Sequence, residues 1–140
     1  MFNIEFLRCQ LELIPSLAGR CDYAENGESA VDYVSRNLEM NSRPEYNWGA
    51  LYQLILLDYS MPKLDGPATA IRIKKLYEEY NRRSNDEISM PFIVCLTAFT
   101  EQIFEQTARA AGMKQFVSMP ITNAKLRQIL QEQKFLSLSD

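Results

Sequence analysis

The residues of this chain that are best placed for chemistry stand where three short apolar runs end. The first run stops abruptly at Asp58, the second stops at Thr97, and the third leads into Met119. Apolar runs without polar alternation are typical of strands covered on both faces, as in a parallel sheet. The carboxyl ends of parallel strands share one edge, and chemistry gathers there in such folds. We therefore expect a carboxylate and a hydroxyl to converge on one edge of a parallel sheet.

The elements that would position these residues follow from hydrophobic spacing, which alternates between helical and extended periods. The predicted order is a helix over Phe2–Leu17, a strand over Arg20–Ala24, a helix over Gly27–Leu38, a loop over Asn41–Ala50, a strand over Leu54–Leu57, a helix over Pro67–Tyr80, a strand over Phe92–Leu96, a helix over Thr100–Ala111, a strand over Gln115–Ser118 and a helix over Thr122–Gln133. This alternation predicts an α/β fold in which a parallel sheet lies between helices.

Composition limits the class of protein. The chain has 140 residues, enough for one domain, and its 46% hydrophobic content is too high for a disordered tail. The net charge of -3 argues against binding to nucleic-acid phosphates, where a basic stripe is expected. No apolar stretch is long enough to span a bilayer, and no signal peptide heads the chain. We therefore expect a cytoplasmic protein with neither a membrane nor a nucleic-acid partner.

Histidine and cysteine usage narrows the chemistry further. The chain contains no histidine, which excludes a histidine general base, a histidine metal ligand and a phosphohistidine carried by the chain itself. Its three cysteines, Cys9, Cys21 and Cys95, are odd in number and far apart in sequence. They indicate neither a disulfide framework nor a paired metal site. We interpret all three as buried small hydrophobic residues in a reducing compartment.

Several motifs, in the expected order, resemble those of response-regulator receiver domains, the CheY-like family. Residues 56–66 (LLDYSMPKLDG) resemble the phosphorylation loop, residues 95–98 the fourth strand with its switch threonine, and residues 111–120 the fifth strand. Residues 24–27 match the turn into the second helix, and the first helix resembles that of receivers attached to hybrid histidine kinases. The similarity implies a doubly wound, flavodoxin-like parallel sheet in a single domain over residues 1–140, with residues 135–140 as a flexible tail.

The resemblance also implies a function. In the family, an aspartate at the Asp58 position accepts a phosphoryl group from a phosphohistidine of a histidine kinase or a histidine phosphotransfer domain. Mg²⁺ is held there by an acidic pair after the first strand, by the aspartate and by a backbone carbonyl, here that of Ser60. The hydroxyl of Thr97 would donate to the phosphoryl group, and Phe116 would be the aromatic switch coupled to it. The chain would then be a phospho-acceptor in a two-component phosphorelay and not an enzyme.

The chain departs from this pattern where the family has a lysine after the fifth strand. That position is Met119, whose thioether supplies neither a cation nor a hydrogen-bond donor. The loss of a charge-assisted contact to the phosphoryl group would weaken the phosphorylated form. Lys114, the nearest basic residue in sequence, would lie at the wrong end of the strand to replace it. We therefore predict an impaired phosphorylation site.

A larger departure concerns the first strand. Because the chain begins with what resembles the family's first helix, the first strand and its acidic pair are missing. Asp58 alone would bind Mg²⁺ weakly or not at all. In the family's strand order 2-1-3-4-5 the missing strand lies inside the sheet, so its absence would be costly against a total stability of about 5–15 kcal/mol.

Four remedies would fill the vacant position of that strand. Another molecule could supply it by self-association or strand exchange, the sheet could be rearranged, or the chain could be a fragment of a larger product. The tail, residues 135–139, could also enter the position, although its alternating pattern suits a strand with one wet face.

Two functions of other classes compete with phosphorylation. In the first, the chain is a pseudo-receiver that binds partners independently of phosphorylation, and Phe116 is then a core residue. The second is hydrolysis of the haloacid type, which also uses an aspartate nucleophile. That chemistry lacks its expected second acid, because Ser60 stands two residues after Asp58.

Overall fold

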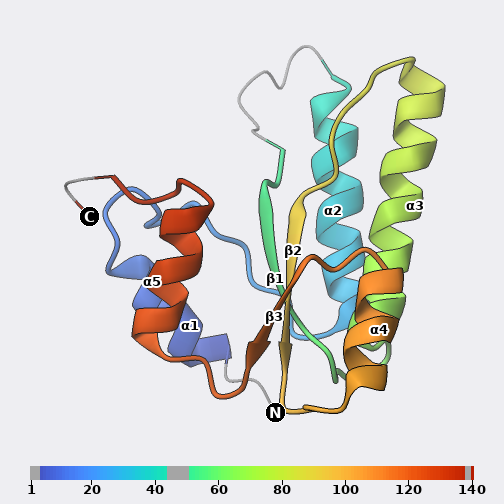
Figure 1. Cartoon of the computed structure of the whole chain (residues 1–140). Coiled ribbons are helices and arrows are strands. Elements are labelled where there is room, and N and C mark those ends of the chain that lie inside the picture. Colours follow the sequence, from blue (N-terminus) through green and yellow to red (C-terminus); the bar gives the residue numbers. More distant parts are fainter. Residues whose placement is uncertain (1–3, 44–50, 138–139) are drawn as a thin grey trace.

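A parallel sheet stands at the centre of the computed structural model, with helices on both of its faces (Figure 1). The structure describes residues 4–43, 51–137 and 140. Within them the elements are α1 (Ile4–Glu12), α2 (Gly27–Asn41), β1 (Leu54–Asp58), α3 (Gly66–Ser84), β2 (Phe92–Thr97), α4 (Gln102–Ala110), β3 (Gln115–Ser118) and α5 (Asn123–Glu132). Helices on both faces of a parallel sheet confirm the predicted flavodoxin-like α/β class.

The strands lie in the order β1-β2-β3, so β2 is the central one. Leu57 of β1 pairs with Cys95 of β2, and Cys95 pairs with Phe116 of β3. The interior of β2, Ile93–Leu96, is 0% exposed, as expected for an apolar run covered on both faces. The lack of alternation in this run therefore indicated its place in the fold correctly, whereas Leu54–Leu56 of β1 are only half-buried.

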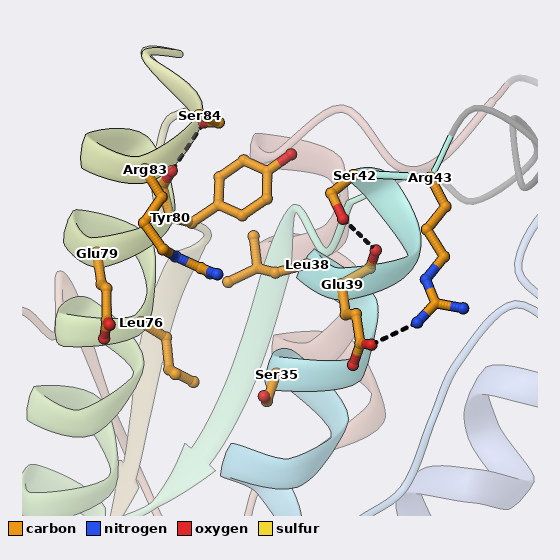
Figure 2. Close-up of a pocket in the computed structure, with 10 residues that line it drawn as sticks. All are labelled: Ser35, Leu38, Glu39, Ser42, Arg43, Leu76, Glu79, Tyr80, Arg83 and Ser84. Atoms are coloured by element: carbon orange, nitrogen blue, oxygen red, sulfur yellow. Dashed lines mark hydrogen bonds and ion pairs between the residues drawn. The ribbon is translucent and has the colours of Figure 1, made fainter.

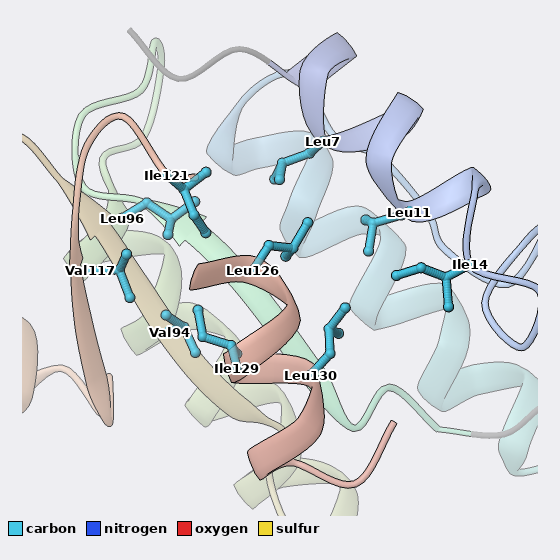
Figure 3. Packing of buried hydrophobic residues seen from close by; sticks show 10 residues of the cluster. All are labelled: Leu7, Leu11, Ile14, Val94, Leu96, Val117, Ile121, Leu126, Ile129 and Leu130. Atoms are coloured by element: carbon cyan, nitrogen blue, oxygen red, sulfur yellow. The ribbon is translucent and has the colours of Figure 1, made fainter. Parts of the chain in front are cut away.

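Alternate residues of the strands build separate cores on the two faces of the sheet. Val94 and Leu96 pack with residues of α1 and α5, which lie together on one face (Figures 1 and 3). Ile93 and Cys95 point to the other face, where they pack with Ala108 of α4 and with α3. A third cluster joins α2 to α3 through side chains that include Val34, Leu38, Ile73, Tyr77 and Tyr80.

Side-chain caps fix where three helices begin. Asn26 accepts a hydrogen bond from the Ser29 backbone nitrogen at 2.9 Å, and Asp65 accepts one from the Ala68 nitrogen at 2.9 Å. At α5, Thr122 accepts from the backbone nitrogen three residues on, at 3.1 Å. Each cap satisfies a backbone N–H that has no partner inside the helix. Asp65 is therefore occupied in starting α3, the helix that follows the Asp58 loop.

The predicted strand over Arg20–Ala24 is wrong, because this segment forms no strand. In the described part of the chain β1 pairs only with β2, so Arg20–Ala24 pairs with no strand and makes no ladder hydrogen bonds. The segment is held by side chains instead. Cys21 and Tyr23 pack against the α1–α5 core, and the Tyr52 hydroxyl donates to the Asp22 carboxylate.

Two other predictions meet the limits of the described residues. Most of the predicted loop over Asn41–Ala50, residues 44–50 with Tyr46 and Trp48, lies outside them, and Asn41 itself ends α2. The described tail residues 135–137 form no strand and do not pair with β1, whereas residues 138–139 lie outside the described part of the chain. Phe135 and Leu136 pack against the α1–α5 core. The flexibility of residues 135–140 stays a prediction.

The carboxylate of Asp140 connects the last described residues to the segment that follows α1. It accepts hydrogen bonds from the backbone nitrogen and hydroxyl of Ser16, at 3.1 and 2.6 Å. It also accepts from the nitrogen and hydroxyl of Ser137, at 2.7 and 2.9 Å. These bonds, the Ser137 backbone bond first, hold the pKa of Asp140 below its ordinary value.

We expect Asp140→Asn to remove a pH-dependent part of the stability. Because the pKa is lower in the folded state, the carboxylate stabilises the fold above its ordinary pKa, and this contribution is lost as pH falls below about 4. Urea unfolding at pH 7 and pH 3 measures it. The difference in the free energy of unfolding between the native chain and Asp140→Asn should be smaller at pH 3 than at pH 7. Asp86→Asn, in an exposed connection, is the control, and its difference from the native chain should be the same at both pH values. A difference for Asp140→Asn that does not change with pH would contradict the prediction.

Candidate functional site

Asp58 ends β1 at the carboxyl edge of the sheet. The residue is 8% exposed, and its Oδ1 accepts a hydrogen bond from the Ser60 backbone nitrogen at 3.1 Å. The loop after it turns back at once, since the Gly66 nitrogen donates to the Tyr59 oxygen at 2.8 Å. The carboxylate is thus held at the mouth of a tight loop and is almost fully covered.

Thr97 ends the neighbouring strand at the same edge. Asp58 pairs with Leu96, so Thr97 stands one position further along β2, and adjacent strands lie about 4.8 Å apart. The Thr97 hydroxyl oxygen accepts a hydrogen bond from the Phe99 nitrogen at 2.9 Å. Accepting that bond leaves the hydroxyl proton for donation. The structure therefore brings the two strand-end residues predicted from sequence to one edge.

A pocket of about 220 Å³ opens beside Thr97, between the ends of β2 and β3 and helix α4. Its wall includes the half-buried ring of Phe116, the predicted switch residue. Cys95 also lines it, and burial, then the charge of Asp58, raises the pKa of this thiol to about 12. Cys95 is therefore a neutral, buried group and not a nucleophile. Among the other cysteines Cys9 is exposed, contrary to the expectation that all three are buried.

Sequence reasoning missed an aromatic cluster over this pocket. The rings of Phe99 and Phe104 stack with centroids 4.1 Å apart, and Tyr59 meets both edge-on at 5.5 and 5.4 Å. Tyr59 follows Asp58 directly, whereas the phenylalanines come from the β2–α4 connection and from α4. Nothing in the spacing of these residues indicated their contact, since it depends on how α4 packs against the sheet.

Comparison with known proteins identifies the arrangement. The receiver domain of a sensor histidine kinase from Pseudomonas aeruginosa, solved with a magnesium ion in its active-site cleft, is 25% identical with a TM-score of 0.64, over 92% of this chain and 85% of that one. The osmosensing histidine protein kinase SLN1 of Saccharomyces cerevisiae is 32% identical over 122 residues, 87% of this chain and 8% of the kinase. The chain is a receiver domain of the CheY-like family.

Two further comparisons support this receiver assignment. Histidine protein kinase 1 of Candida albicans is 28% identical over 120 residues, 86% of this chain and 4% of the kinase. A chain of the yeast co-crystal of the phosphotransfer protein Ypd1 with the receiver domain of Ssk1 has a TM-score of 0.68 at 21% identity, over 92% of this chain and 79% of that one, which shows the fold alone. No family model matches the chain. The receiver spans 4 to 8% of the two kinases' lengths.

The residues around Asp58 do not by themselves fit a magnesium ion. Within residues 4–43, 51–137 and 140, no three acidic, histidine or cysteine side chains gather into a possible metal site. A site made of Asp58 and the Ser60 carbonyl would offer too few charged oxygens, because Mg²⁺ requires six ligands in octahedral geometry. Weak or absent Mg²⁺ binding by this chain alone stays a prediction.

Met119, predicted from the sequence to replace the family's lysine, follows β3 and has its side chain against the core. It is half-buried and packs against the α1–α5 cluster, while its backbone nitrogen donates to the Thr97 oxygen at 2.9 Å. Lys114 precedes β3, at the other end of the strand, where its backbone nitrogen donates to the Ile93 oxygen at 2.8 Å. As expected from the sequence, Lys114 is in no position to replace the missing cation.

A larger groove, of about 600 Å³, lies between α2 and α3 and is separate from this site (Figure 2). Leu38, Leu76 and Tyr80 line its apolar part, and Glu39 pairs with Arg43 at 2.7 Å on its rim. Helix α3 begins beside Asp58, and the groove lies along its far half. No described helix is long and apolar enough to cross a membrane.

Proposed function

We propose that this receiver domain accepts a phosphoryl group on Asp58 from a phosphohistidine of a cytoplasmic histidine kinase or histidine phosphotransfer protein. The observation that supports it is the covered carboxylate of Asp58 beside the Thr97 hydroxyl at the sheet edge. Relatives that are histidine kinases support the class of donor. The product is a phosphorylated regulatory domain, so no substrate is turned over.

The transfer would use this chain's own groups as follows. An Asp58 carboxylate oxygen attacks phosphorus, the P–N bond to the donor imidazole breaks, and the imidazole keeps that electron pair and takes up a proton. The Thr97 hydroxyl then donates to a phosphoryl oxygen, which draws the β2–α4 connection toward the site. Since Phe116 lines the same pocket, a movement of Thr97 would be transmitted to its ring.

We further propose that a strand from outside the described residues pairs with the open side of β1 and brings the missing acids. Leu54, Ile55 and Leu56 are only half-buried, unlike the interior of β2, although their apolar run is typical of a strand covered on both faces. The strand could come from a longer form of this chain or from a second molecule by strand exchange. Its final residues would lie next to Asp58, where a cation would otherwise lack ligands.

Extending the chain at its amino end tests the strand proposal. An added apolar strand that ends in two aspartates should raise Mg²⁺-dependent labelling by acetyl phosphate and protect the β1 amides from hydrogen exchange. The control is the same strand ending in two asparagines, which should protect β1 without raising labelling. Equal labelling of both extended chains, or unprotected β1 amides, would contradict the proposal.

In the chain extended with acids, we expect Met119→Lys to raise the yield of phosphorylated protein on the order of tenfold. A charge-assisted hydrogen bond to the phosphoryl group contributes roughly 1.5–3 kcal/mol. Labelling at equal donor concentration measures the change. Met119→Leu keeps an apolar side chain in the α1–α5 core and serves as the control. If Met119→Lys labels no better than Met119→Leu, the lysine position is not what impairs the site.

The second candidate is a pseudo-receiver that binds partners without phosphorylation. It is favoured by the Met119 side chain, which is packed in the core instead of directed to the phosphoryl position. The two functions differ in a direct assay. A phospho-acceptor takes label from a phosphorylated phosphotransfer protein, whereas a pseudo-receiver takes none and binds its partner equally well as Asp58→Asn.

A further inference from the structure

The ring of Phe116 is held from outside by a side chain of α4. The guanidinium carbon of Arg109 lies 4.5 Å from the centre of the Phe116 ring. Arg109 in turn pairs with Glu105 one helical turn earlier, with nitrogen and oxygen 3.0 Å apart. Glu105, Arg109 and Phe116 therefore form a continuous series of contacts from the exposed face of α4 to the middle of β3.

The ring also has space into which it could move. Phe116 lines the pocket of about 220 Å³ that reaches Thr97, a volume of several water molecules at about 30 Å³ each. The ring thus has Arg109 on one side and the pocket beside Thr97 within its reach. A cation over an aromatic face stabilises the ring position in contact with Arg109.

We propose that Arg109 is a positioning residue that holds Phe116 out of the pocket beside Thr97, and that Glu105 orients Arg109. The role of Phe116 as a switch rests on the proposed phospho-acceptor function, but its contact with Arg109 does not. Arg109 and Glu105 are 57% and 47% exposed in their side chains, so the contact is weak enough to be broken by a movement at Thr97. This Arg109–Phe116 contact, here called the latch, sets how readily the Phe116 ring moves when Thr97 moves.

Fluorine NMR of the full chain containing 4-fluorophenylalanine tests this without any phosphorylation. The Phe116 signal is assigned by its loss in Phe116→Leu. In Arg109→Gln we expect it to shift and broaden, with the population inside the pocket raised about two- to fivefold, the size of an exposed cation–π contact. Arg109→Lys keeps the charge and should restore most of the native signal, and Glu105→Gln should give a smaller shift of the same sign.

Matched controls exist on α2 and just after its end. Arg36 lies 4.9 Å from the ring of Tyr33, and Arg43 pairs with Glu39 at 2.7 Å, so Arg36→Gln and Arg43→Gln remove the same kinds of contact away from the site. Both should leave the Phe116 signal unchanged. The proposal is overturned if Arg109→Gln also leaves it unchanged, or if the controls shift it equally. Should Arg109→Gln fail to fold, Glu105→Gln decides by the same criterion.

Labelling by a phosphorylated phosphotransfer protein then distinguishes the positioning role of Arg109 from the switch role of Phe116. If Arg109→Gln moves the ring and changes the labelling rate, both the latch and the switch stand. If the ring moves while labelling is unaffected, the latch stands and the switch role of Phe116 fails. If the ring does not move in Arg109→Gln and Asp58 is labelled normally, only the positioning role of Arg109 is contradicted.

Discussion

Asp58→Asn is expected to reduce phosphoryl labelling to background. The asparagine amide has nearly the shape of the carboxylate, but it is no nucleophile toward phosphorus and forms no acyl phosphate. The Ser60 nitrogen, 3.1 Å from Oδ1, can still donate to the amide oxygen, so the loop should keep its form. Intact mass after incubation with a phosphorylated phosphotransfer protein, or with acetyl phosphate, measures the gain of one phosphoryl group. The label should be lost in alkali, as acyl phosphates are.

Asp65→Asn is the matched control for this experiment. Asp65 is an exposed carboxylate in the same loop, where it caps α3 through the Ala68 nitrogen at 2.9 Å. Asparagine caps helices about as well as aspartate does, so this variant should fold and accept label normally. Label that persists in Asp58→Asn, or that disappears only in Asp65→Asn, would place the acceptor elsewhere. If the chain extended with the acid-bearing strand takes no label from any donor, the pseudo-receiver is favoured.

Gly66→Ala is expected to destabilise the fold by about 1–3 kcal/mol and to weaken labelling as well. A Cβ at this position would lie 2.5 Å from the Asp58 backbone oxygen and 2.8 Å from the Cα of Tyr59. Neither atom belongs to a flexible side chain, so the backbone that carries the acceptor must move. The helix propensity of alanine offsets about 1 kcal/mol of the cost and does not remove the overlap. Urea unfolding gives the stability, and mass spectrometry gives the label.

Gly19→Ala separates local displacement from general destabilisation. Gly19 has a φ of +74°, a conformation that costs an alanine about 1 kcal/mol, and no atom lies within 4 Å of its added Cβ. This variant should lose stability but label like the native chain at a temperature where both are folded. If Gly66→Ala proves as stable as the native chain, or if both variants lose label alike, the close approach of α3 to Asp58 does not control the site.

The accuracy of the sequence predictions follows how local each one is. The strands at Leu54–Asp58 and Phe92–Thr97 were found because an unbroken apolar run needs no information about its partners. The start of α3 was found within one residue, since Pro67 and the preceding turn act through their own backbone. The strand predicted over Arg20–Ala24 failed because a strand requires a neighbour, and no described strand lies beside it.

The strand-end residues of the site were also available from sequence. Parallel strands bring their carboxyl ends to one edge of the sheet, so Asp58 and Thr97 could both be placed at that edge from the sequence. The direction of the Met119 side chain could not be placed in this way. Its residue type excluded a donor, but its packing into the α1–α5 core depends on side chains from both ends of the chain.

The sequence by itself determined the class of fold, the carboxylate at the end of the first apolar strand and the absence of a lysine after the last strand, because residue type and period are properties of a single segment. The tertiary structure alone decided that Arg109 covers Phe116, that three aromatic rings meet beside Thr97, and that one side of β1 has no partner among the described strands. These contacts depend on how separate elements lie relative to one another, and that arrangement is set when the helices pack against the sheet.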